Sequence, residues 1–280
     1  MKKIILSAAL ATAMISANAQ DMMSKKGTPI LPEAKDWSIG FDAAPLLGYF
    51  GNLFNNTVDN SVSARYQQNM MLVGKMMKDE NTAMRAKLRI GFGSNSNDAI
   101  LDQDGSTSNP PATVTDNRKI SSMNFNIGAG IQKYRGKGRL KGFYGAEAGI
   151  GIGSSKTTYT YGNAFSSTNP SPSSTDWGSN INQTTGERTT EDKNGSTFGI
   201  SLRGFIGAEY FFAPKMSLSA EYGWGLGLSS TGEGETTSEF WDSGATTPGV
   251  KTVTSKSGKS SNFNLDVDNA GGQIVLSMYF

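Results

Sequence analysis

The chain has 280 residues, of which 36% are apolar and 18% are charged, and it contains 34 glycines but neither cysteine nor histidine. Disulfides, thiolate zinc sites and every mechanism that uses a thiol or an imidazole are therefore excluded. This glycine content is well above the usual share of about 7%, and together with the low hydropathy it argues against a helical enzyme.

The first residues predict a secretory signal peptide over residues 1–19. Two lysines precede an apolar run over 4–15, and residues 17–19 (Ala-Asn-Ala) have the small side chains of a signal peptidase site. The run is too short for a membrane anchor, which needs about 20 apolar residues. Without the leader, which holds two of the 26 basic residues, the chain carries 24 basic and 24 acidic residues. This balance gives no reason to expect a nucleic-acid partner.

The rest of the chain alternates between apolar and polar residues. Every even position from Met84 to Phe92 is apolar, whereas Arg85, Lys87 and Arg89 occupy odd positions. A period of two is typical of a strand with one apolar and one polar face. The pattern predicts eight strands, at about 37–50, 68–77, 82–94, 120–134, 141–155, 196–212, 216–229 and 263–280.

The connections between these strands alternate between long and short. The long ones are 51–67, 95–119, 156–195 and 230–262, and the short ones are 78–81, 135–140 and 213–215. Short turns on one side and long loops on the other are typical of outer-membrane barrels, and an even strand number places both termini in the periplasm. We therefore predict an all-β fold, an eight-stranded antiparallel transmembrane up-and-down β-barrel over residues 37–280, after a short periplasmic segment 20–36.

The two short turns are constrained because residues paired across a ladder face the same side. A three-residue turn at 213–215 is expected to place Phe212 opposite Met216. A two-residue turn, Lys137-Gly138, is expected to place Gly136 opposite Arg139. Large inward side chains then face glycines, which fits a narrow interior. The expected inward pairs are Arg203–Gly225, Phe205–Gly223, Glu221–Gly207, Glu147–Gly128 and Asn126–Gly149.

Two strands lack a clean alternation. Residues 68–77 are apolar in both phases, and we favour the even positions facing outward. In 263–280 the apolar phase changes from odd to even, so a bulge is expected near 269–272.

The strand phases predict which charged side chains point inward. They are Asp42, Arg85, Lys87, Arg89, Glu147, Arg203, Glu209 and Glu221. Because an unpaired buried charge is very costly, we expect a hydrogen-bonded ion network that fills the interior. A narrow pore for ions or small solutes is the alternative use of the same side chains.

No catalytic, cofactor-binding or metal-ligating residue is predicted. Carboxylates alone need a substrate cleft between them, which a filled tube does not offer. The Gly-x-Gly runs at 149–153 and 223–227 lie inside strands and lack the lysine of a phosphate-binding loop. Asp102-x-Asp104-Gly105 begins like a calcium loop but lacks the later glutamate.

The signal peptide, the eight alternating segments and the terminal residues 273–280 (QIVLSMYF) resemble the small OmpA/OmpX-type outer-membrane barrels. The segment 75–85 is also similar to a strand-turn-strand of such barrels in Bacteroidetes-like bacteria. The resemblance implies that the last strand is the sorting signal read by the barrel-assembly machinery. The residues that carry this signal are Ile274, Leu276, Met278, Tyr279 and Phe280. Outer-membrane barrel enzymes use a catalytic histidine, which is lacking, so we expect no enzyme.

The long loops are the expected place of partner recognition. Residues 156–195 are rich in Ser, Thr, Asn and Gly, and we expect them to stay hydrated without burying a core. In 230–262, Phe240 and Trp241 lie among acidic residues and are the candidate contacts for a host or matrix ligand. The expected role is therefore structural or interactive at the cell surface, in contact with outer-membrane lipid. A loop-mediated adhesin or receptor is a second alternative.

Overall fold

The computed structural model describes residues 22–43, 72–178, 180–184 and 186–280, with only the backbone described for 266–272. The predicted signal peptide, and residues 44–50 and 68–71 of two predicted strands, lie outside these ranges. Within them, no helix has the length and apolar character needed to cross a membrane. The strands are β1 (Trp37–Asp42), β2 (Leu72–Asp79), β3 (Thr82–Asp102), β4 (Thr113–Arg135), β5 (Leu140–Thr160), β6 (Ser173–Thr175), β7 (Ile181–Gln183), β8 (Glu187–Lys193), β9 (Thr197–Ala213), β10 (Met216–Thr231), β11 (Glu235–Asp242), β12 (Gly249–Lys256) and β13 (Ser260–Tyr279).

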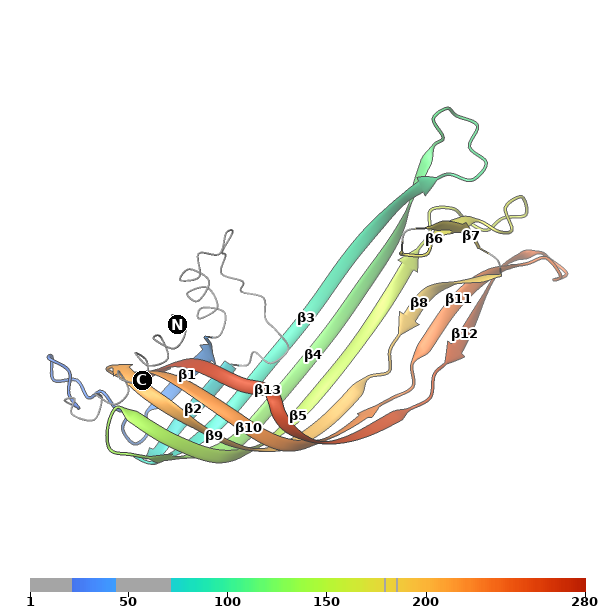
Figure 1. Ribbon diagram of the computed structural model, residues 1–280. Helices are drawn as coiled ribbons and strands as arrows, with labels where there is room; N and C mark the ends of the chain where they lie inside the picture. Colours follow the sequence, from blue (N-terminus) through green and yellow to red (C-terminus); the bar gives the residue numbers. More distant parts are fainter. Residues whose placement is uncertain (1–21, 44–71, 179, 185) are drawn as a thin grey trace, which may run out of the picture.

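Eight of these strands form a closed antiparallel ring. Their order is β1-β2-β3-β4-β5-β9-β10-β13, and β13 pairs again with β1 (Figure 1). They correspond one by one to the eight predicted strands, so the all-β antiparallel prediction is confirmed. Apolar side chains at every second position give each strand one apolar face. Strands that follow one another in the ring are joined alternately by long segments and by short turns.

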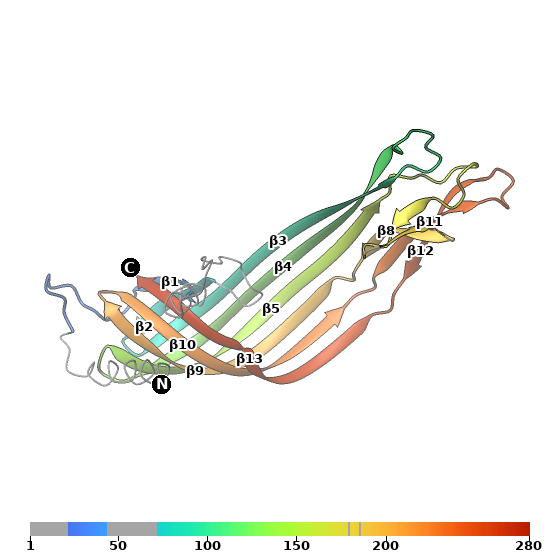
Figure 2. The ribbon, with the colours of Figure 1, turned by 45° about the horizontal axis from the view of Figure 1, so that its top comes forward.

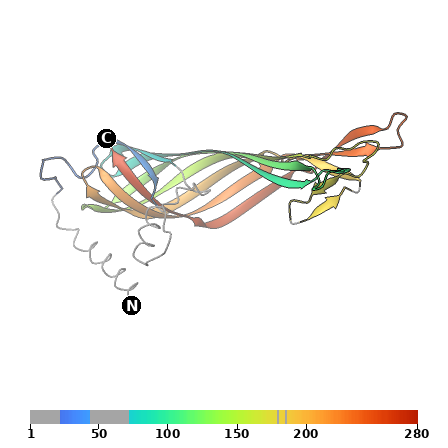
Figure 3. The same ribbon diagram turned by 90° about the horizontal axis from the view of Figure 1, so that it is seen from above.

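Beyond the ring, the ends of β3, β4 and β5 and three further strands form an open sheet of six strands, which we call the extension. It consists of β8, β11 and β12 together with 94–102 of β3, 113–121 of β4 and 156–160 of β5, in the order β12-β11-β8-β5-β4-β3 (Figure 2). Seen from above, the ring lies at one end of the molecule and the extension at the other (Figure 3).

The extension corrects the prediction of long loops at 95–119, 156–195 and 230–262. Much of each segment is strand. These strands are largely polar on both faces, and their few apolar residues, such as Ile100, Val250 and Val253, form no sustained period of two. Backbone hydrogen bonds to a neighbouring strand hold them in place without an apolar face.

The predicted register is confirmed for β9 and β10, where Arg203 lies opposite Gly225, Phe205 opposite Gly223 and Glu221 opposite Gly207. At the turn itself the prediction is wrong. Ala213 pairs with Met216 and the next pair joins Ser217 to Phe211, so that Phe212 is bulged out of the ladder.

The predicted register between β4 and β5 is wrong by two residues. Glu147 lies opposite Gly130, and Asn126 lies opposite Gly151. Arg135 pairs with Gly142, so the turn is longer than two residues, and Gly136 enters it with φ of 116°. The requirement that paired residues face the same side limits the turn only to an even number of residues. Because the side-chain period is two, every residue still faces its predicted side.

Both uncertain strands are resolved as expected. In β2, Leu72 and Met76 are exposed while Val73, Lys75 and Met77 are buried, so the even positions face outward. In β13, the pairing with β10 shifts register between Asp268 and Gln273, which places the bulge in the predicted segment.

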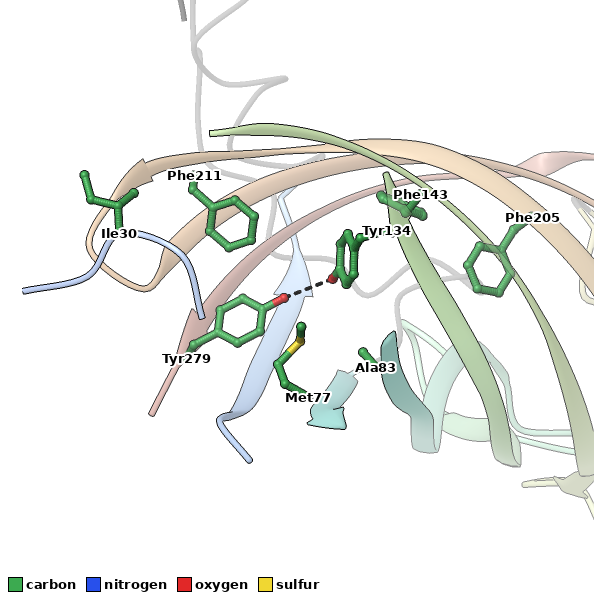
Figure 4. Close-up of a cluster of buried hydrophobic side chains, with 8 residues drawn as sticks. All are labelled: Ile30, Met77, Ala83, Tyr134, Phe143, Phe205, Phe211 and Tyr279. Carbon is green, nitrogen blue, oxygen red and sulfur yellow. Dashed lines mark hydrogen bonds between the residues drawn. The ribbon is translucent and has the colours of Figure 1, made fainter. Parts of the chain in front are cut away.

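A small apolar core fills the end of the ring that carries the short turns. It contains Ile30, Met77, Ala83, Tyr134, Phe143, Phe205, Phe211 and Tyr279 (Figure 4). Ile30 comes from the segment before β1, and its carbonyl oxygen accepts a hydrogen bond from the Lys215 amide at 3.0 Å. Lys215 Nζ also lies 2.8 Å from Asp36 Oδ2. The segment predicted only as a short periplasmic stretch therefore packs onto the end of the ring.

Candidate functional site

The outer face of the ring is covered by large apolar side chains, and no other described part of the chain buries them. Phe92 is 77% exposed, Ile206 63% and Leu202 53%. Others on the same face are Trp37, Ile39, Phe41, Leu72, Met76, Met84, Leu88, Ile90, Met123, Ile127, Ile131, Tyr144, Ile150, Ile152, Phe198, Ile200, Phe212, Tyr222, Trp224, Leu228, Phe263, Leu265, Met278 and Phe280. Soluble proteins rarely expose so large a continuous apolar surface.

The inner face of the ring has the opposite character, and its charged residues gather in two clusters. The lower cluster surrounds Glu209, whose side chain is fully buried. Lys75 Nζ and Tyr134 Oη each donate to Glu209 Oε2 at 2.8 Å, and Tyr279 Oη donates to Oε1 at 2.9 Å. Ser217 Oγ donates to the same Oε1. The four donors satisfy both carboxylate oxygens, which a buried charge requires.

The upper cluster joins three cations to two carboxylates. Arg85 Nη1 lies 2.6 Å from Glu221 Oε2, and Lys87 Nζ lies 2.9 Å from Glu147 Oε1 and 3.3 Å from Glu221 Oε1. Arg203 Nη1 contacts the same two oxygens at 3.1 and 3.0 Å. Four strands, β3, β5, β9 and β10, therefore contribute to one set of shared hydrogen bonds across the ring.

The strands that face these inward side chains can lie close to them because they carry glycine, which has no Cβ atom. A Cβ atom on Gly130 would lie 2.6 Å from Glu147 Cβ, and one on Gly145 would lie 2.5 Å from Phe205 Cζ. A Cβ on Gly223 would overlap the Arg203 guanidinium. The prediction that inward side chains face glycines is confirmed, with Gly130 in place of Gly128.

An open cavity of about 830 Å³ lies where the ring passes into the extension. Its walls are mostly small and polar, and they include Ser122, Asn124, Thr197 and Arg89. Arg89 pairs across the ladder with Asn126, only a few residues above Lys87. The lining of the cavity thus begins two residues along β3 from Lys87 of the upper cluster.

Five of the eight predicted inward residues form the upper cluster, and Glu209 forms the centre of the lower one. Asp42 and Arg89 are half-buried on the same inward phase. Sequence reasoning missed Lys75, because its strand is apolar in both phases. It also missed Tyr134 and Ser217, whose inward phase was readable but whose polar atoms were not considered.

The C-terminal residues divide between the two faces. Met278 and Phe280 are exposed on the outer face, where the Phe280 ring stacks on Trp37 with centroids 4.8 Å apart. Ile274 and Leu276 are half-buried on the same phase. Tyr279 points inward to Glu209 and is 3% exposed.

The far end of the extension is covered by residues 162–178 and 180–184, which we call the cap. Asp116 of β4 is fully buried there and accepts hydrogen bonds from the amides of Gly162 and Thr175 at 2.8 and 2.9 Å. Arg188 Nη1 donates to the Asn163 carbonyl at 2.8 Å. The expectation that 156–195 stays hydrated is therefore wrong for these residues, because hydrogen bonds hold the segment in place and bury Asn163, Thr184 and Arg188.

Aromatic residues complete the cap. The Arg188 guanidinium lies 4.2 Å from the Tyr161 ring centroid and 4.6 Å from that of Phe165. Burial raises the pKa of Tyr161 to about 12. Its hydroxyl therefore remains a donor, and it hydrogen-bonds the Thr189 carbonyl at 2.6 Å.

The predicted aromatic contact pair does not form one surface. Phe240 and Trp241 are consecutive residues of β11 and half-buried. Successive side chains of a strand point to opposite faces, so these two rings lie on different sides of the extension.

No protein-family model, curated protein or solved structure gives a significant match to this chain. Among the described residues, no group of three or more acidic side chains is placed to hold a metal ion.

Proposed function

We propose that the protein is an integral outer-membrane β-barrel, similar to the OmpA/OmpX type, that presents a rigid β-sheet at the cell surface. One observation carries the proposal: exposed apolar side chains surround a ring whose interior holds buried ion pairs. Water on the outside would make this arrangement unfavourable, whereas lipid makes it favourable because it solvates apolar side chains and excludes charged ones.

The dimensions of the apolar surface support the same conclusion. At about 3.3 Å per residue, the stretch of β10 from Leu218 to Leu228 is about 33 Å long, and a strand tilt of about 40° leaves about 25 Å across the membrane. This height matches the apolar band of outer-membrane barrels. The short turns then lie on the periplasmic side and the extension outside the cell.

The interior favours a structural role over a pore. The upper cluster spans the ring below the cavity, and the lower cluster and the apolar core lie beneath it. An ion would have to displace shared hydrogen bonds at both levels. The pore therefore ranks second, and steady single-channel conductance that disappears in Glu147→Gln or Arg203→Gln would establish it instead.

Surface interaction is the role that the extension supports. Its strands are joined edge to edge and its cap is hydrogen-bonded to β3, β4 and β8, so it offers a fixed shape to a partner. A host or matrix ligand would be recognised there, and removal of 235–256 should abolish its binding while the ring stays folded.

Spin labels at Leu202 and Arg203 test the proposal directly. These neighbours lie on opposite faces of β9, so in vesicles of phosphatidylcholine the label at 202 should contact acyl chains and the label at 203 should not. Equal lipid contact at the two sites, or failure of the refolded protein to float with vesicles, would overturn it.

A further inference from the structure

The outer face changes abruptly just above the apolar surface of the ring. Two adjacent cross-strand rows of residues run without a break from β3 through β4, β5, β8 and β11 to β12. These six strands can be followed in Figure 1. The first row is Ser94, Ser121, Lys156, Lys193, Glu235 and Lys256, and the second is Ser96, Lys119, Thr158, Glu191, Thr237 and Thr254. We call these two rows the basic band.

The rows lie on the same face as the apolar surface. Lys156 is on the phase of Ile150 and Ile152 in an uninterrupted stretch of β5. Contacts within the rows agree, since Lys156 Nζ lies 2.8 Å from Glu191 Oε2 and the hydroxyls of Thr237 and Thr254 are 3.4 Å apart. None of the twelve residues is buried, and none is apolar.

The charges of the basic band do not balance. Within the two rows, four lysines face two glutamates. Glu233, next to the band, lies 3.8 Å from Lys256 and 3.7 Å from Lys259, and with these two neighbours included the excess is still two positive charges. Lys156 and Lys193 lie directly opposite each other on β5 and β8. Like charges in that position destabilise a sheet. Glu191 offsets the charge of Lys156, and a bound anion would offset that of Lys193 as well. The six remaining side chains are all hydroxyls, which donate hydrogen bonds to phosphate oxygens.

From this juxtaposition we infer that the basic band binds the phosphate-bearing headgroups of anionic lipids in the outer leaflet. The inference rests on the proposed membrane location. The partner is lipid because the band continues the apolar surface directly: acyl chains against Phe92 and Ile152 place their headgroups at the level of Ser94 and Lys156. Five strand spacings of about 4.8 Å give the band a width of about 24 Å, enough for several headgroups.

The test compares the triple variant Lys156→Gln/Lys193→Gln/Lys256→Gln with a control triple at the other end of the ring. The control, Lys78→Gln/Lys133→Gln/Lys137→Gln, removes the same charge from exposed lysines near the short turns. Each protein is refolded into vesicles of phosphatidylcholine and phosphatidylglycerol. Native mass spectrometry of the released protein then counts the two lipids that stay bound.

Wild type and control should retain phosphatidylglycerol in preference to phosphatidylcholine. Each lysine near a charged membrane surface is worth about fivefold in binding, so the band variant should lose at least about fivefold of the preference. High salt should reduce the wild-type preference as well. Equal preference in wild type and the band variant, equal loss in both variants, or displacement of the lipid by excess inorganic phosphate would overturn the inference.

Flotation separates this outcome from failure of the proposed function. All three proteins should float with vesicles of phosphatidylcholine alone, because insertion depends on the apolar surface. A protein that does not float refutes the membrane location itself, whereas floating without lipid preference refutes only the role of the basic band.

Discussion

The ring and the extension share strands, yet they distribute polarity in opposite ways. In the ring, β3 places apolar residues outside and ion-paired residues inside; above residue 93 the same strand is largely polar on both faces. The ion pairs differ in the same way, since those inside the ring are buried and most of those of the extension are exposed. The side chains of Lys75 and Glu209 are 2% and 0% exposed, whereas those of Lys256 and Glu233 are 61% and 47% exposed.

The contrast shows that the same antiparallel strand pairing can be used in two surroundings, the proposed lipid around the ring and water around the extension. Cross-strand hydrogen bonds satisfy the backbone in both regions, so the side chains alone report what surrounds each part. Where lipid is proposed, polar groups are confined to the interior and must be fully paired there. Where water surrounds both faces, hydroxyls and loosely paired charges suffice.

The largest expected effect comes from breaking a buried pair in the ring. Glu209→Ala removes the acceptor of four donors and leaves the Lys75 ammonium without its carboxylate, which should cost about 3–5 kcal/mol of unfolding free energy. Guanidinium titration of the vesicle-reconstituted protein measures this loss. Glu233→Ala in the exposed pair should cost under about 1 kcal/mol. Similar losses in the two variants would contradict the contrast between the regions.

Changing the outer face should distinguish the two regions almost as strongly. Leu202→Arg places a charge against the proposed hydrocarbon and should lower the unfolding free energy by about 2–4 kcal/mol. Thr115→Arg, on the same face of β4 in the extension, should change it by less than about 0.5 kcal/mol. The same titration measures both, and a neutral Leu202→Arg would mean that water surrounds the ring.

Glycine substitution tests how tightly the ring is filled. In Gly130→Ala the new methyl group would meet the Ala146 carbonyl and Glu147 Cβ, so we expect a loss of about 1–3 kcal/mol. Gly249→Ala at the start of β12 meets nothing within 4 Å and serves as the control. Thermal loss of the folded gel band can rank the two variants. A Gly130→Ala protein as stable as the control would show that β4 and β5 are free to move apart.

The same contrast explains how far the sequence could be interpreted. The ring was predictable because its strands carry a strict period of two, and their phases placed Arg85, Lys87, Glu147, Arg203 and Glu221 on one face before any contact was known. Lys75 was not found, because an apolar strand has no phase. The shift of Glu147 from Gly128 to Gly130 was also invisible, since pairing two residues further along keeps every side chain on its side.

The extension was misinterpreted for a physical reason as well. Sequence patterns detect burial of apolar area, and strands such as β8 and β12 have polar residues on both faces. Their order comes from pairing with β5 and β11, which no local pattern encodes. In the cap, Asp116 and Arg188 hold the chain through backbone groups that come from 46 and 25 residues away.

The smallest expected effect is a pH response confined to the cap. Burial acts to raise the pKa of Asp104, but hydrogen bonds from the Ser173 amide at 2.7 Å and from Asn169 Nδ2 at 2.8 Å outweigh it, and the pKa lies below its ordinary value of 3.8. A lowered pKa in the folded state means that the stabilisation is complete above the ordinary value and is lost as the pH falls through the lowered one.

Hydrogen exchange at the Ser173 amide, corrected for the intrinsic rate, should therefore report acid-induced opening of the cap while amides of β9 stay protected. The expected change is about 1 kcal/mol or less, because Asp104 is only half-buried. Asp104→Asn keeps an acceptor oxygen but cannot titrate, so it should weaken the pH dependence at this amide. If the variant opens over the same pH range as the wild type, another group controls the cap, and the carboxylate of Asp104 is not what fixes the 162–178 segment to the turn that follows β3.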